Sequence, residues 1–132
     1  MAALIAAHEG GDQPAHLLGF IACFNGGRFF EAHDVLEELW LRERGGANGE
    51  FYKGLIQLAG AFVHVEKGRP APATALLKLA RVRLAAFPHG HLRLNTRAAL
   101  GLIDAWLTVL AAVSDPGWRE GMRPPRLDCL RG

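Results

Sequence analysis

The chain has 132 residues, of which 50% are hydrophobic and 21% are charged, and its formal net charge is +2. This length fits one domain, and the hydrophobic content suffices for a core, which excludes disorder over most of the chain. The charge is only weakly positive and no long run of Lys and Arg occurs, which argues against nucleic acid as a partner.

Membrane segments and disulfides are not expected either. The most hydrophobic stretch, residues 98–113, is shorter than the roughly 20 residues that span a bilayer, and it contains Asp104. Residues 1–7 are apolar but lack the basic start of a signal peptide. Cys23 and Cys129 are too few and too far apart for a disulfide framework or a zinc knuckle. The sequence therefore predicts a cytoplasmic protein with no membrane partner.

Five helices are predicted, because apolar residues recur at spacings of three and four. In chain order they cover about residues 12–24, 28–44, 48–67, 72–86 and 95–114. Asp12 and Asn48 are expected to cap the first and third helices, and Pro72 to lie in the first turn of the fourth. The links are short, which favours an all-α fold in the form of an antiparallel bundle.

The expected domain organisation has three parts. Residues 1–11 form a flexible N-terminus, residues 12–114 form the helical bundle domain, and residues 115–132 form an extended tail rich in Pro and Arg. The apolar side chains expected to hold this tail on the bundle are Trp118, Leu127 and Leu130.

The second predicted helix carries a polar pair at the edge of its apolar face. His33 and Glu37 are one turn apart, so their side chains are neighbours, and Trp40 follows on the same edge. The acidic residues expected on the opposite, solvent-exposed face are Glu31, Asp34 and Glu38.

The third predicted helix is apolar except for one narrow stripe. Its members are Lys53, Gln57, Gly60 and His64. In an antiparallel hairpin closed near Ala47, Glu37 lies level with Gln57 and faces the stripe. His33 then lies level with Gly60, which would make room for a side chain of the facing helix.

These residues predict a divalent-metal site. His and Glu one turn apart can bind one ion together, and water on such an ion can serve in hydrolysis. Two ligands are too few, so His64 is the expected third, with Glu31 or Gln57 as the next choices. The residues expected to line the site are Glu31, Trp40, Lys53 and Gln57.

Two other interpretations remain open. In the first, His33, Glu37 and Trp40 form a structural polar lock, and the apolar third and fifth helices form a homodimer or hold another partner. In the second, a basic patch around the loop of His89 and His91 binds phosphate or nucleic acid. The arginines of that patch are Arg81, Arg83, Arg93 and Arg97. Asp104 could pair with Arg97, orient a histidine or face water.

The segment from Phe24 to Trp40 resembles the signature of the domain of unknown function 309 family of bacterial and archaeal proteins. The segment from Phe51 to Ala59, with His64, resembles its second block. The resemblance spans about residues 17–86. It implies an all-helical fold and a metal role for the motif His-x-x-x-Glu-x-x-Trp, which His33, Glu37 and Trp40 match. It implies no particular activity.

One position departs from the family pattern. The family commonly has Gln before the Gly of the second block, where this chain has Lys53. If this position faces the site, a Lys adds positive charge near a metal ion and weakens its binding.

Overall fold

The computed structural model describes residues 14–113 and 123–130, and in this part it confirms an all-α fold with five α-helices. These helices are α2 (Ala15–Asn25), α3 (Phe29–Glu43), α4 (Gly49–Glu66), α5 (Pro70–Ala85) and α6 (Thr96–Ala111). A short 3-10 helix, η1 (His91–Arg93), precedes α6. The predicted cap Asp12 and the tail residue Trp118 lie outside the described residues.

Two helix starts differ from the prediction. Helix α5 begins at Pro70 rather than near Pro72, because a proline in the first helical position lacks only an N–H group that would have no partner in the helix. Asn48 lies at the N-cap of α4, but its side chain makes no capping bond there. Its Oδ1 atom instead accepts a hydrogen bond from His91 Nε2 at 2.7 Å, so a tertiary contact replaces the predicted cap.

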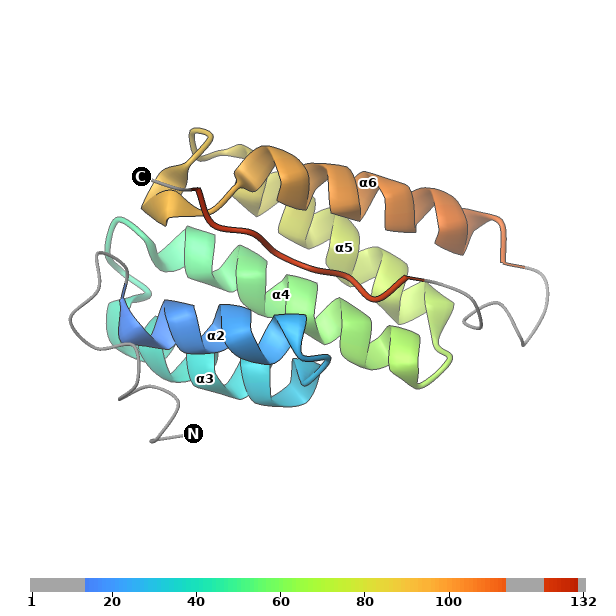
Figure 1. Cartoon of the computed structure of the whole chain (residues 1–132), viewed down its shortest axis with the longest axis horizontal. Helices are drawn as coiled ribbons and strands as arrows, with labels where there is room; N and C mark the ends of the chain where they lie inside the picture. Colours follow the sequence, from blue (N-terminus) through green and yellow to red (C-terminus); the bar gives the residue numbers. More distant parts are fainter. Residues whose placement is uncertain (1–13, 114–122, 131–132) are drawn as a thin grey trace.

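Successive helices run antiparallel, and each packs against the next in the chain (Figure 1). The links at Gly27 and Gly68 have φ values of +76° and +69°, which glycine adopts without strain. Helix α4 lies between the α2–α3 pair and the α5–α6 pair. Of the described helices, none combines the length and the apolar character that crossing a membrane requires.

The core is centred on α4 and contains a chain of aromatic contacts. The Phe62 ring lies 5.7 Å from Phe24 on α2, 5.4 Å from Phe29 on α3 and 5.1 Å from Trp106 on α6. Such pairs add about 0.5–1.5 kcal/mol each to the effect of burial. Most of α4 is covered by α3 and α5, and its predicted role in dimerisation stays a prediction.

The C-terminal segment 123–130 runs in extended form along the bundle between α4 and α6 (Figure 1). Leu127 is only 2% exposed and joins the core, as predicted for this part of the tail. The Asn25 side chain bonds both main-chain groups of Leu127, at 2.7 and 2.8 Å. An isolated antiparallel bridge pairs Cys129 with Leu94. Residues 123–130 are therefore part of the packed structure, while the domain bounds at 12 and 114 stay a prediction.

Candidate metal centre

Helix α3 is amphipathic, and its sequence decides which side chains reach its exposed edge. The buried residues recur at spacings of three and four and face α2 and α4; they are Phe29, Ala32, Val35, Leu36 and Leu39. His33, Asp34 and Glu37 fall between these positions. Their side chains are 34%, 51% and 43% exposed, so all three reach solvent.

The three polar side chains converge on one point. His33 Nδ1 lies 3.4 Å from Asp34 Oδ1 and 3.5 Å from Glu37 Oε2. Their ligand atoms all lie within 4.8 Å of one another. These separations are longer than a strong hydrogen bond, which has about 2.7–3.2 Å between N and O. The three side chains are thus close together, but no strong hydrogen bond joins His33 to either carboxylate.

The predicted contact between His33 and Glu37 is confirmed, but the third member of the cluster is Asp34. In the part of the chain that the structure describes, His64 does not join these side chains. His64 has a buried Nδ1 atom without a hydrogen-bond partner. The sequence interpretation missed Asp34 because it assigned this residue to the opposite face. The feature of the sequence that could have indicated Asp34 as a ligand is its place directly after His33.

The predicted register between α3 and α4 agrees with one contact. Lys53 Nζ lies 4.4 Å from the ring centroid of Trp40, so these two residues are level with each other. Because the helices are antiparallel, Glu37, three residues before Trp40, is level with Ile56, three residues after Lys53. The predicted partner of Glu37, Gln57, is thus only one residue away from this level. The role predicted for Gly60 is wrong, because a Cβ atom there would meet Leu76 of α5 at 3.4 Å. Gly60 therefore faces α5 instead of opening towards α3.

The other residues predicted to line the site are dispersed. The Gln57 side chain accepts a hydrogen bond from Arg83 Nη1 at 3.2 Å, and Arg83 Nε also binds Glu50 at 2.7 Å. Gln57 thus belongs to the contact between α4 and α5. Glu31 lines a cleft of about 370 Å³ at the start of α3, together with Phe30, Val63 and Lys67 among others. Glu31 does not join the cluster at His33, and Gln57 is bonded to Arg83.

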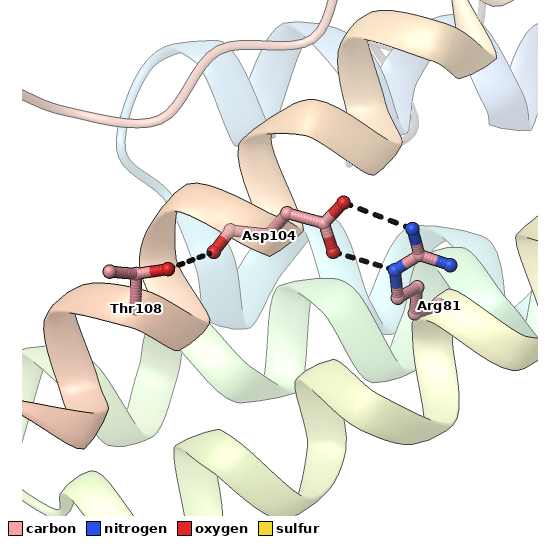
Figure 2. Close-up of polar contacts among 3 residues, drawn as sticks. All are labelled: Arg81, Asp104 and Thr108. Carbon is pink, nitrogen blue, oxygen red and sulfur yellow. Dashed lines mark hydrogen bonds and ion pairs between the residues drawn. The ribbon is translucent and has the colours of Figure 1, made fainter.

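The arginines of the predicted basic patch are mostly engaged inside the chain. Arg81 binds Asp104 with two bonds of 2.6 and 2.9 Å, so Asp104 pairs with Arg81 rather than with Arg97 (Figure 2). Arg93 Nη2 donates to the carbonyl of Leu130 at 3.3 Å. His91 is packed against two Phe rings and bonded to Asn48. Of the four arginines, Arg81 and Arg83 are paired with carboxylates, and binding of phosphate at this patch stays a prediction.

Comparison with known proteins gives one family match. The model of the family described as Domain of unknown function (DUF309) matches residues 17–76. Residues 17–76 are thus similar to this family. The chain is also 30% identical over 104 residues to an uncharacterized protein of Aquifex aeolicus (strain VF5). That match covers 79% of this chain and 28% of the relative. No solved structure matches the chain.

The DUF309 match covers α2, α3, α4 and the start of α5. The cluster of His33, Asp34 and Glu37 thus lies inside the family region, and so does Asn25, which binds the tail. Helix α6 and Leu127 lie outside it. The candidate centre therefore lies in the part of the chain that the family model matches.

Proposed function

We propose that this protein binds a divalent transition-metal ion through His33 Nδ1 and the carboxylates of Asp34 and Glu37. The supporting observation is that the three ligand atoms lie within 4.8 Å of one another on one helix. Zinc bonds of about 2.0–2.2 Å require ligand atoms about 3–4 Å apart, so small side-chain rotations suffice. Helix α3 holds the three groups together, which lowers the entropy lost when the ion binds.

The donor set indicates the class of metal and its use. Imidazole favours zinc, copper, iron or nickel, whereas magnesium and calcium prefer oxygen ligands alone. Three protein ligands leave a position for water, as in catalytic zinc sites. Metal-bound water is a nucleophile near neutral pH, so we propose hydrolysis as the reaction class.

The structural lock is less well supported than the metal site. His33 and Glu37 are both partly exposed and 3.5 Å apart, whereas a lock needs burial and complete pairing. An exposed ion pair contributes about 0–1 kcal/mol to stability. The variant His33→Ala is therefore expected to lose metal binding while its melting temperature changes little.

Zinc titration of the tag-free protein tests the proposal, with affinity read by competition against a chromophoric chelator. The variants His33→Gln, Asp34→Asn and Glu37→Gln are each expected to weaken binding at least about tenfold, since even outer-shell changes cost that much. The matched control is Glu38→Gln, because Glu38 lies on the same helix but faces His16 of α2 at 3.6 Å.

Equal zinc affinities of Glu37→Gln and Glu38→Gln would contradict the site. The hydrolytic part is tested separately with chromogenic carboxylic and phosphoric esters, with and without zinc. Hydrolysis that needs zinc and disappears in Glu37→Gln supports it. Zinc binding without any zinc-dependent hydrolysis would leave the metal site standing and overturn the reaction class.

A further inference from the structure

The outward face of α5 is apolar along the length of the helix. Its exposed positions are Ala71, Pro72, Ala75, Lys78, Leu79, Val82, Ala85 and the adjoining Ala86. Only Lys78 is charged among them. Val82 is 73% exposed and Leu79 is 45% exposed, although both are large and hydrophobic. The opposite face of α5 is also apolar and packs on α4, while Arg81 and Arg83 lie between the two faces. A second apolar face that stays exposed on a helix already packed on the core is typical of an interaction site.

The outward face of α6, the neighbour of α5, consists mainly of small residues. Its exposed positions are Arg97, Ala98, Gly101, Asp104, Ala105, Thr108, Ala111 and the adjoining Ala112. A Cβ atom at Gly101 would meet nothing within 4 Å, so the surface there is open. Small side chains allow the backbone of another helix to approach closely, with larger side chains fitting between them.

The charges between these two faces are paired within the chain. Arg81 of α5 holds Asp104 of α6 through two bonds, and Thr108 Oγ1 donates to the main-chain oxygen of Asp104 at 3.1 Å (Figure 2). A second copy that approaches this surface need not supply a counter-ion for either group. Lys78 and Arg97 have long side chains that can extend their charges into water at the rim of a contact.

We propose that the outward faces of α5 and α6 form a homodimer interface. Leu79 and Val82 of one copy would pack on the surface around Gly101 of the other. One chain carries both the larger side chains and the small ones, so a two-fold axis makes the same contact twice.

The size of this surface suits a weak dimer. Both helices have 16 residues, which corresponds to about 24 Å of length, and two adjacent helices are about 20 Å wide. Each copy would then cover about 500 Å², and the total of about 1,000 Å² is at the lower limit for a specific interface. The proposed metal centre on α3 lies on the other side of α4 from these helices (Figure 1), so the two proposals can fail independently.

Sedimentation velocity of the full chain, from about 1 to about 500 µM, tests the interface. The wild type should change from monomer to dimer over this range. Val82→Glu should raise the dissociation constant at least about thirtyfold, because the contact would bury an unpaired charge in both copies. Gly101→Gln should have the same effect by filling the open surface of α6. Both positions are exposed, so circular dichroism should show an unchanged fold.

The matched control is Leu41→Glu, because Leu41 is 54% exposed but lies on α3. It should dimerise as the wild type does. A wild type that stays monomeric at all these concentrations would overturn the proposal. So would a dimer that survives both Val82→Glu and Gly101→Gln, or one that Leu41→Glu weakens to the same degree.

Discussion

The ammonium group of Lys53 lies 4.4 Å from the ring centroid of Trp40, and this contact joins α4 to α3 beside the candidate metal ligands. The guanidinium of Arg44 lies 5.9 Å from the same centroid. Trp40 is partly buried, and a cation over such a ring contributes about 0.5–2 kcal/mol. Because Trp40 follows Glu37 by one helical turn, the contact keeps a positive charge close to the cluster.

Replacing Lys53 by Gln should therefore strengthen metal binding. A unit charge about 10 Å from a divalent ion opposes binding by up to about 1 kcal/mol at low ionic strength, so the affinity for zinc should rise about two- to fivefold. The gain should shrink as salt is added. Lys78→Gln on α5 is the control and should leave the affinity unchanged. A weaker affinity in Lys53→Gln would show that this side chain supports the site instead of opposing it.

The stability of the fold should fall at acidic pH because of His91. This ring is packed 4.7 Å from both Phe51 and Phe87, and burial lowers its pKa below the ordinary value of a histidine. The unfolded chain then binds a proton before the folded chain does. The neutral His91 ring therefore contributes its full share to the free energy of unfolding above about pH 6.5. This share is lost as the pH falls through the lower pKa of the folded state.

Melting temperatures between about pH 8 and pH 5 measure this effect. The wild type should lose more stability on acidification than His91→Gln, whose amide can still donate to Asn48 but does not titrate. The informative quantity is the difference in melting temperature between the two proteins at each pH. Identical profiles would show that His91 stays accessible to protons in the folded state.

Loss of the Asn25 side chain should loosen the C-terminal segment. Asn25→Ala leaves the N–H and C=O of the buried Leu127 without partners, which should cost about 1–3 kcal/mol in the free energy of unfolding. Asn25→Asp keeps an acceptor but no donor, so it should lie between the wild type and Asn25→Ala. Denaturant titration measures the cost.

Hydrogen exchange shows which part of the chain loses stability in the Asn25→Ala variant. Amides of residues 127–130 should exchange faster in this variant, while those in the middle of α4 keep their protection. Arg126→Ala is the control, because Arg126 lies in the same segment but is exposed. A uniform loss of protection over all helices would mean that Asn25 supports the whole bundle rather than this segment.

The helices of this protein could be predicted from its sequence because the spacing of the apolar residues indicates which side of each helix is buried. The contact between His33 and Glu37 was predictable for the same reason, since one turn of one helix brings them together. The resemblance to the DUF309 family rests on these same segments, and the comparison confirms it over residues 17–76.

Contacts between segments were decided only by the tertiary structure. Gly60 packs towards Leu76, and Asn48 binds His91 instead of capping α4. Both contacts join residues that are distant in the sequence, so they form only when the helices pack. For the same reason, Asp104 forms its ion pair with Arg81 of α5 and not with Arg97 of its own helix. The sequence by itself determined where the chain is helical and which side of each helix is apolar, because both depend on neighbours three or four residues away. Only the packing of the helices against one another decided which polar groups meet and which faces of α5 and α6 stay exposed, because these contacts join residues far apart in the sequence.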